Sequence, residues 1–323
     1  MAASRSRFRV DLLLLVVAVS WGSTYLVAKE LVTPSSVVAL LALRMLLAAA
    51  IMAGVVGVRR QRVTLAEVRA GALLGLLLSA VFAFETFGIA HTSATNAGLI
   101  ISLTIVFTPL LDSVVSGRHL PGRFFSAAGV AVLGVVLLAG DGGVRPPSLG
   151  DLLVLGAALA RAVYVTSTHR ITMARPMDTL HLTAVQLATC AAVFTVISVF
   201  TGESIPSYVV RLDPGRALLF LYLVVVCTVF AFFVQTWAVR RTSPSRVGLL
   251  LGTEPVWAAI GGIVIAHDHV AAVGYCGIAL ILAATSWGRS IERRHRLLSD
   301  RKASRPSEEP LSDKPLSEKP LSA

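Results

Sequence analysis

His91-Thr-Ser-Ala-Thr-Asn-Ala-Gly98 has a counterpart 150 residues downstream in the same chain, Arg241-Thr-Ser-Pro-Ser-Arg-Val-Gly248. With no gap in between, Thr104-Ile-Val-Phe107 then falls on Glu254-Pro-Val-Trp257 at the same shift. Self-similarity at a fixed spacing is the sequence mark of repeated structural units. We therefore expect the chain to be built from two copies of one unit.

The two copies also begin alike, and their contents set their relative orientation. Asp11-Leu-Leu-Leu-Leu15 pairs with Asp151-Leu-Leu-Val-Leu155 at a shift of 140 residues. Each copy holds five apolar segments long enough to cross a bilayer. Because five is an odd number, the second copy must enter the membrane from the opposite side. Inverted repeats with a site between them are typical of many secondary transporters.

Composition places the chain in a membrane. Hydrophobic residues make up 55% of the 323, mean hydropathy is +0.77, and only 15% of the residues are charged. The apolar residues come in blocks of about 20, the length of helix that spans ~30 Å of hydrocarbon. Strand-type alternation is absent, so helices must satisfy the backbone. We predict an all-α membrane protein with ten transmembrane helices as two inverted five-helix repeats, spanning 10–30, 36–58, 70–90, 94–116, 124–140, 150–169, 179–200, 217–239, 246–266 and 269–288.

Breaks in the apolar pattern divide the chain. Gly and Pro residues in Asp141–Ser148 end the first copy, so we expect five-helix repeats over residues 1–143 and 144–290. The remaining residues, 291–323, begin with basic side chains and are rich in Pro and Ser, which predicts a disordered cytoplasmic tail. A cleaved signal peptide is disfavoured, because the first apolar run continues to Val27 and reappears in the second copy.

The positive charge of the chain is distributed by side of the membrane. The net charge is +11, and 23 of the 29 Lys and Arg residues fall on one side of the predicted spans. The opposite loops hold only 4, namely Lys29, Arg145, Arg211 and Arg216. This positive-inside asymmetry places both termini in the cytoplasm and the protein in the cell membrane as a multi-pass protein. The basic charge thus reflects topology, and we expect a lipid bilayer and no nucleic acid as partner.

Few ionisable residues lie inside the predicted spans, and each calls for an explanation because a charge in hydrocarbon costs ~2.5–3.5 kcal/mol. For Arg44 the alternatives are an internal salt bridge, with Glu85 or Glu254 as partner, and an anchor or gate contact for a substrate anion. Each glutamate is a proton carrier, a neutral hydrogen-bond donor or a partner of Arg44. Arg161 is a second functional charge or a paired one, and pairing is favoured.

Aromatic residues complete the candidate site. Trp21-Gly-Ser-Thr-Tyr25 places aromatic, small and hydroxyl side chains together in the first span, an arrangement that suits substrate contact or plain packing. We assign no catalytic residue. The predicted substrate-binding cavity, with Arg44 as its charge anchor, contains Trp21, Tyr25, Arg44, Glu85, Trp237 and Glu254.

Signatures of other protein classes are missing. His267-Asp268-His269 is similar to a metal pair only superficially, since we expect a tight extracytoplasmic turn there. The three Cys residues lie in predicted helices without metal spacing. No nucleophile elbow, phosphate-binding glycine loop or zinc spacing occurs. We therefore predict no enzyme activity, no cofactor and no metal.

Three motifs resemble the EamA branch of the drug/metabolite transporter superfamily. Trp21-Gly-Ser-Thr-Tyr-Leu-Val-Ala-Lys29 is similar to the first-helix stretch of the family. Leu43-Arg-Met-Leu-Leu-Ala48 resembles its Arg-containing second helix, and Thr253-Glu-Pro-Val256 its Glu-Pro-Val segment in helix nine. The resemblance covers about residues 10–290 and implies inverted five-helix repeats, cytoplasmic termini and a central cavity for small metabolites.

Two positions depart from the family pattern. Ile105 stands where first repeats of the family usually have proline, and Arg118 stands where they have an acidic residue. Asp268 keeps the acidic choice in the second repeat. The missing proline predicts a straighter helix four, which weakens the expectation of symmetric gating by helices four and nine.

The sequence as a whole predicts a secondary active transporter of a small organic metabolite or drug-like solute, working by alternating access. The resemblance favours export over uptake. The alternatives are a passive channel and a non-transporting membrane receptor or scaffold that acts through its C-terminal tail. The expected partners are a small-molecule substrate and the lipid bilayer; a proton or other coupling ion, and a homodimer, are left open.

Overall fold

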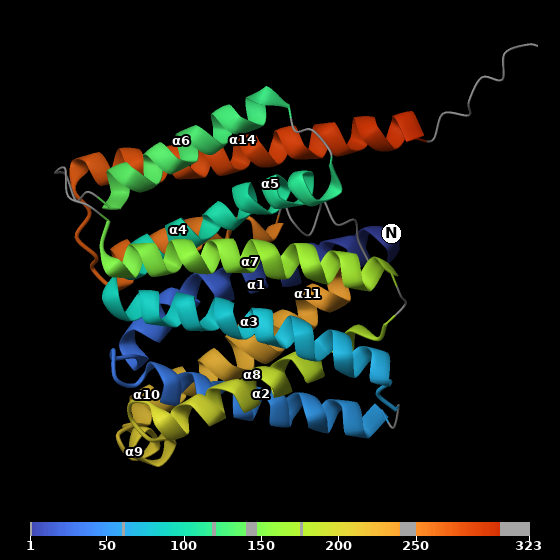
Figure 1. Ribbon diagram of the computed structural model, residues 1–323. Coiled ribbons are helices and arrows are strands. Elements are labelled where there is room, and N and C mark those ends of the chain that lie inside the picture. Colours follow the sequence, from blue (N-terminus) through green and yellow to red (C-terminus); the bar gives the residue numbers. More distant parts are fainter. Residues whose placement is uncertain are drawn as a thin grey trace, which may run out of the picture.

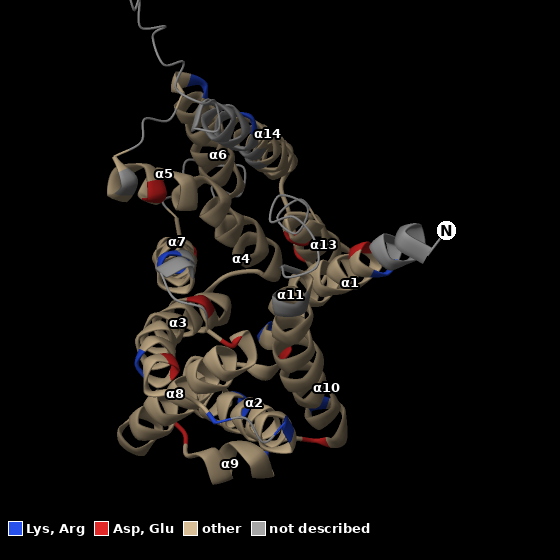
Figure 2. Cartoon of the chain, turned by 90° about the vertical axis from the view of Figure 1, so that its right-hand side faces the viewer, with Lys and Arg blue, Asp and Glu red and all other residues tan. Residues whose placement is uncertain are grey.

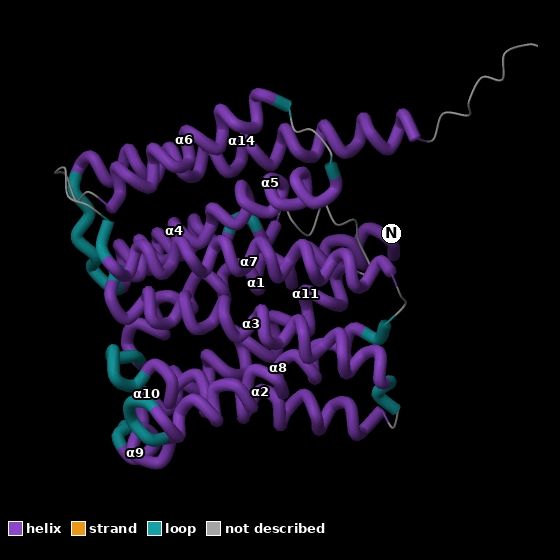
Figure 3. Tube along the Cα trace, in the orientation of Figure 1, coloured by secondary structure: helices purple, strands orange, loops and turns teal. Residues whose placement is uncertain are grey.

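The computed structural model describes residues 2–59, 62–117, 121–139, 147–174, 177–239 and 250–303. Within these ranges the chain forms helices joined by short loops and contains no strand (Figure 1 and Figure 3). The prediction of an all-helical protein is confirmed for this part of the chain.

The helices of the first half are long and apolar. Helix α3 starts with a capping box, in which the side chains of Thr64 and Glu67 each accept a hydrogen bond from the backbone N–H of the other residue. The bounds are α1 Ala2–Leu31, α2 Val37–Arg59, α3 Leu65–His91, α4 Ala94–Ile100, η1 Ile101–Leu103, α5 Thr104–Ser116 and α6 Gly122–Ala139.

The second half contains two π-helical segments, η2 and η3, within otherwise α-helical stretches. Asp213 caps α10 by accepting the backbone N–H of Arg216 at 3.0 Å, and this bond holds the pKa of the Asp213 carboxyl below its ordinary value. The bounds are α7 Leu149–Ala174, α8 Thr179–Phe200, α9 Ile205–Val210, α10 Pro214–Val224, η2 Val225–Phe230, α11 Ala231–Val239, α13 Glu254–Ile260, η3 Gly261–Ile265 and α14 Ala272–Ala303.

Many of these segments match the predicted spans. Three shorter apolar helices, Gly122–Leu138, Glu254–Ile265 and Ala272–Gly288, lie at the predicted fifth, ninth and tenth spans. The start of the predicted ninth span, residues 246–249, lies outside the described residues. The chain is thus a multi-pass membrane protein, and the number ten stays a prediction. Seven described segments are long and apolar enough to cross a bilayer: Arg9–Leu31, Val37–Arg59, Leu65–His91, Ala94–Val115, Leu149–Thr172, Thr179–Phe200 and Pro214–Gln235.

Helices from the two halves pack against each other. Helix α2 lies along α8, α6 lies along α14, and α3 lies along both α7 and α8. Helix α13 packs against α1 and α4, while α7 packs against α5. In Figure 1, α6 and α14 run side by side along one edge of the molecule. Figure 2 shows α2, α3, α7 and α8 grouped on one side, and α1, α10, α11 and α13 grouped on the other.

The predicted fourth helix is interrupted. Helices α4 and α5 are separated by the 3₁₀ turn η1, although Ile105 replaces the expected proline. The hydroxyls of Ser102 and Thr104 donate to backbone carbonyl oxygens three residues earlier, at 2.6 and 2.8 Å. Bonds of this kind compete with the regular helix ladder and favour a tighter turn. The expectation of a straighter helix four was wrong, because these two hydroxyls break the helix without a proline.

A turn of the same kind lies 150 residues later, in the predicted helix nine. The backbone N–H of Thr253 donates to the carbonyl oxygen of Leu250 at 3.2 Å, and its hydroxyl donates to the same oxygen at 2.8 Å. Helix α13 then begins at Glu254, and α5 begins at the aligned residue, Thr104. Pro255 occupies the first turn of α13, where its missing N–H leaves no bond unmade.

Glycine residues let α1 and α4 approach α13 closely. A Cβ atom built on Gly98 of α4 would overlap the Cβ of Ala258, and one built on Gly22 of α1 would lie 2.6 Å from the Cβ of Trp257. Small residues permit such backbone contact between membrane helices. The three helices therefore meet at a crossing without intervening side chains, beside the ring of Tyr25.

Candidate functional site

A cavity of about 230 Å³ is lined by side chains from both halves of the chain. Of the six predicted site residues, Trp237 belongs to α11, and its side chain lies outside the described residues. The structure thus brings most of the predicted set to one place, while the binding of a substrate by these residues stays a prediction. The other five predicted residues all line the cavity: Trp21, Tyr25, Arg44, Glu85 and Glu254.

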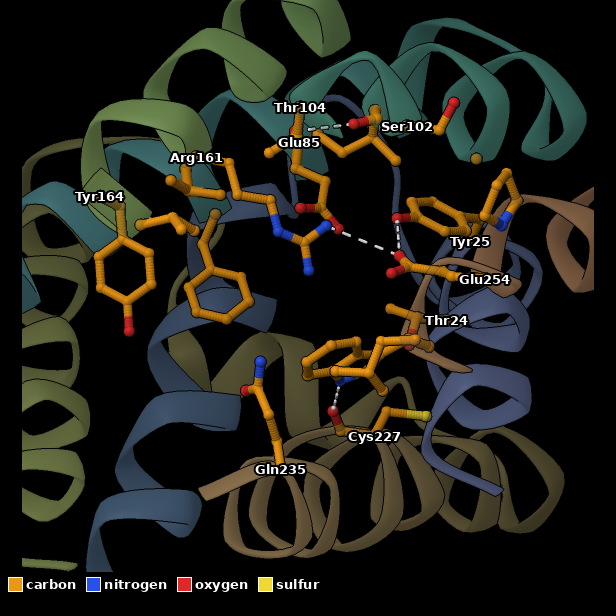
Figure 4. Close-up of a pocket in the computed structure, with 18 of the residues that line it drawn as sticks. Thr24, Tyr25, Glu85, Ser102, Thr104, Arg161, Tyr164, Cys227, Gln235 and Glu254 are labelled. Carbon is orange, nitrogen blue, oxygen red and sulfur yellow. Dashed lines mark hydrogen bonds and ion pairs between the residues drawn. The ribbon is translucent and has the colours of Figure 1, made fainter. Parts of the chain in front are cut away.

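Glu254 holds together a charged cluster on one wall of the cavity (Figure 4). The hydroxyl of Tyr25 donates to Glu254 Oε1 at 2.7 Å, and Nη1 of Arg161 lies 3.6 Å from the same oxygen. Figure 4 shows the Glu85 carboxylate directed toward the Arg161 guanidinium as well. The pairing favoured for Arg161 is therefore found, with Glu254 as its partner.

Arg161 also contacts an aromatic wall. Its guanidinium carbon lies 5.5 Å from the ring centroid of Trp21, within the range of a cation–π interaction. The indole Nε1 of Trp21 donates to the carbonyl oxygen of Cys227 at 3.1 Å, and its ring meets Phe232 edge to face at 5.7 Å. Arg161 was not among the six candidates. The available signal was its alignment with Trp21 at the 140-residue shift.

Arg44 lies in a different environment from Arg161. It is buried, its Nε donates to the hydroxyl oxygen of Thr228 at 2.9 Å, and its guanidinium lies 5.0 Å from the ring centroid of Phe82. Among the described residues no carboxylate oxygen lies within 4.0 Å of its side-chain nitrogens. Of the two alternatives for Arg44, the internal salt bridge with Glu85 or Glu254 is therefore not formed among the described residues, and Glu254 is paired with Arg161 instead.

The remaining lining is mostly apolar. The hydroxyl of Tyr164 donates to Gln186 Oε1 at 2.7 Å and so is already paired. Among the described residues the cavity therefore offers Arg44 without a carboxylate within 4.0 Å, the ion pair of Arg161 and Glu254 with Glu85 beside it, and apolar surface. Such a site suits a small solute with a charged end and an apolar body. The apolar part of the lining includes Leu78, Val81, Phe82, Ile101, Ile105 and Phe232.

Polar contacts close the helix bundle around the turn between α3 and α4. Lys29 Nζ donates to the carbonyl oxygen of Thr92 at 2.6 Å. Asp151 Oδ1 accepts the hydroxyl of Thr92, also at 2.6 Å. Asp268 Oδ2 accepts both the backbone N–H and the hydroxyl of Thr95 at 2.8 Å. We call these five residues the α3–α4 latch; they tie the turn to α1, to α7 and to the loop after η3.

The segment His267–His269 lies in the loop between η3 and α14, and the tight extracytoplasmic turn stays a prediction. His267 has a positive φ of 54°, and Asp268 belongs to the latch. In the described part of the chain, no group of three or more His, Cys, Asp or Glu side chains is arranged to hold a metal ion.

Comparison with known proteins gives matches along most of the chain. A sequence model described as the EamA-like transporter family matches it twice, at residues 8–140 and 148–287. A protein of Archaeoglobus fulgidus named as an uncharacterized transporter is 26% identical over 279 residues, which cover 86% of this chain and 85% of the relative. A second protein of that organism with the same name is 29% identical over 197 residues, and here the match spans only 64% of the relative.

The chain is also similar to a relative whose name is more specific, and to a separate protein of known structure. A protein of Streptantibioticus cattleyicolor named as a probable terminal-alkyne amino-acid exporter is 33% identical over 122 residues, 38% of this chain and 40% of that protein. A crystal structure with 18% sequence identity matches with a TM-score of 0.60 over 89% of this chain and 98% of that chain, so the two share a fold.

Proposed function

This chain belongs to the EamA-like transporter family, and on that premise we propose that it carries a small organic solute across the membrane by alternating access. One observation carries the proposal: the buried cation of Arg44 lines a cavity without a carboxylate within 4.0 Å among the described residues. A buried charge in a membrane protein is costly unless a partner compensates it. An anionic group of the solute supplies that partner.

Helix packing supports two inverted repeats at residues 1–143 and 144–290. When the halves are exchanged, α1, α2, α3 and α6 correspond to α7, α8, the α10–α11 pair and α14. The contact of α3 with α7 then has a counterpart in α1 with α10 and α11, and that of α3 with α8 has one in α2 with α10. The pairs α2–α8 and α6–α14 map onto themselves. A pseudo-two-fold axis in the membrane plane produces such a pattern.

The lining of the cavity favours a small zwitterion with an apolar side chain, such as an amino acid. Arg44 is suited to the carboxylate of the solute. Glu254 is paired with Arg161, and the Glu85 carboxylate is directed toward the same guanidinium, so this cluster has carboxylate capacity left for an ammonium group. The apolar lining between them is suited to the side chain. The partial match to a protein named as an amino-acid exporter agrees with this solute class and with export as the direction.

We place the protein in the cytoplasmic membrane with both termini in the cytoplasm, on the 23-to-4 distribution of basic residues. On this topology Lys29, Thr92, Asp151 and Asp268 all lie at outer ends of spans. Thr92 contacts Lys29 and Asp151, and Asp268 contacts the nearby Thr95, so these residues share one side of the membrane, as this topology requires. In this proposal the latch lies on the outer side of the cavity and closes it.

The test is transport by the full-length chain in proteoliposomes. Labelled L-amino acids, simple sugars and organic amines are offered in turn, with and without a proton gradient. We expect saturable flux of at least one amino acid, and loss of that flux in Arg44→Ala. Flux that does not saturate indicates a channel. If no solute moves, and removal of residues 291–323 abolishes a cellular phenotype of the intact chain, a receptor or scaffold is indicated. Either result contradicts the proposal.

A further inference from the structure

Arg44 is oriented by a π-helical segment in the other half of the chain. Its hydrogen-bond acceptor, Thr228, belongs to η2 and is completely buried, with 0% of its surface exposed. Thr228 is not part of the cavity lining, whereas Arg44 is. π-Helical turns inside α-helices occur frequently at functional sites. Thr228 of η2 therefore contacts a residue that lines the cavity without lining the cavity itself.

The widened turn fixes the direction of the Thr228 hydroxyl. Its Oγ1 donates to the carbonyl oxygen of Leu223, five residues earlier, at 2.9 Å. A threonine in a regular α-helix bonds instead to a carbonyl three or four residues earlier. Because the hydroxyl proton is used in this bond, the lone pairs of Oγ1 are what Thr228 presents to Arg44. The π turn makes Thr228 a fixed acceptor for the Nε–H of the guanidinium.

Two contacts hold the Arg44 guanidinium, and neither of them uses its two terminal amino groups. The Nε–H is bonded to Thr228, and one face of the group lies against the ring of Phe82. The two terminal amino groups of Arg44 make no ion pair or other hydrogen bond with a described residue. A planar guanidinium presents a pair of parallel N–H groups that match the two oxygens of a carboxylate.

We propose that Thr228 is a positioning residue that holds Arg44 as a fork for a substrate carboxylate and so sets the preference of the site for carboxylates over neutral amides. This inference rests on the proposed function, in which Arg44 contacts the solute. It adds a chemical requirement: the preferred solute carries a carboxylate group. A merely cationic or neutral solute leaves the fork unpaired.

The test compares L-leucine with L-leucinamide, which differ only at the carboxylate. Binding of radiolabelled L-leucine to the purified full-length protein is measured with either compound as competitor. We expect the wild-type protein to prefer L-leucine by at least about tenfold, the scale of one charge-assisted hydrogen bond. In Thr228→Val, which keeps the side-chain shape but loses the hydroxyl, the preference falls below about threefold. Thr228→Ser keeps the acceptor and the wild-type preference.

Two further variants separate positioning from packing. Arg44→Lys keeps the charge but lacks Nε and the planar fork, so adding Thr228→Val to it should change the preference no further. Thr183→Val is the matched control, because the buried Thr183 hydroxyl bonds to a carbonyl of its own helix, four residues earlier, and Thr183 does not line the cavity. This control should retain the wild-type preference.

The proposal is overturned if Thr228→Val keeps the full preference for L-leucine, or if Thr228→Ser loses it to the same degree. It is also overturned if the wild-type protein binds L-leucinamide as well as L-leucine. Saturable transport of amines or amides in proteoliposomes would then leave the proposed function standing without the carboxylate fork. Should Thr228→Val fail to insert, Thr228→Cys replaces it, and an unchanged preference in that variant counts against the proposal.

Discussion

Arg44 and Arg161 line the same cavity but are held in different ways. Arg161 is paired with Glu254 and lies over the ring of Trp21. Arg44 has a neutral hydroxyl and the face of Phe82 as its contacts among the described residues. A guanidinium with a carboxylate at ion-pair distance is compensated inside the protein, whereas one without such a neighbour leaves more of its charge to be compensated by a ligand. The comparison assigns an internal ion pair between α7 and α13 to Arg161, and recognition of the solute to Arg44.

The largest effect is expected from Arg44→Ala. Loss of two charge-assisted hydrogen bonds to the solute, each about 1.5–3 kcal/mol, predicts a fall in transport of about 10²–10⁴-fold. Insertion should persist, because no carboxylate is left without its partner. Initial rates in proteoliposomes, normalised to the amount of inserted protein, measure the effect. A variant as active as the wild-type protein removes Arg44 from the site and ends the comparison.

The next effect concerns the folded state rather than the solute. Arg161→Met leaves Glu254 without its ion-pair partner, and breaking such a pair costs about 3 kcal/mol. Adding Glu254→Gln removes the unpaired carboxylate and should restore part of the stability. The thermal unfolding midpoints of the purified variants show the difference. If the double variant is no more stable than Arg161→Met, the ion pair of Arg161 with Glu254 does not stabilise the folded state.

A smaller effect is expected from Tyr25→Phe, which removes one hydrogen bond to the Glu254 carboxylate and keeps the ring. The expected loss is about 1.5 kcal/mol, or roughly tenfold in transport at low solute concentration. In a Glu254→Gln background the same substitution should cost less, because the acceptor is no longer charged. Equal losses in both backgrounds would mean that Tyr25 acts independently of Glu254.

The smallest effect is expected from Asp268→Ala in the latch. Loss of its two hydrogen bonds to Thr95 costs about 1 kcal/mol, which shifts the equilibrium toward an outside-open state by about fivefold. A single cysteine at Ile105, in a chain whose three native cysteines are replaced, reports this shift through labelling by an impermeant maleimide from outside. Unchanged labelling would show that the latch does not limit access to either arginine.

The convergence of Trp21, Tyr25, Arg44, Glu85 and Glu254 on one cavity follows from a simple property of the sequence. Charged and paired aromatic residues are rare in apolar spans, so those present have few places to go except an enclosed polar space. The side chains with which these residues pair cannot be predicted from the sequence in the same way. Glu254 and Arg161 face each other only once α13 and α7 have packed around the cavity, and the residue numbers do not encode that approach.

Two irregular turns of the structure were not predicted from the sequence, because the hydrogen bonds that shape them leave no clear pattern in it. The break at η1 lacks the proline that usually signals such a feature, and two hydroxyls produce it instead. Thr228 carries no signal at all, because an apolar run does not reveal where a helix widens into a π turn. Helix type and approximate extent are therefore predictable here, whereas the irregular turns that shape the cavity depend on bonds formed after packing.

The glycine crossing of α1, α4 and α13 restricts how the two halves can move. At Gly98 and Ala258 the backbones of the interrupted helices touch directly, so sliding of one along the other brings larger side chains into collision. Rotation about this contact avoids such collisions. In the proposed alternating-access cycle the crossing serves as the pivot, and tilting about it widens the passage at one membrane face as it narrows the passage at the other.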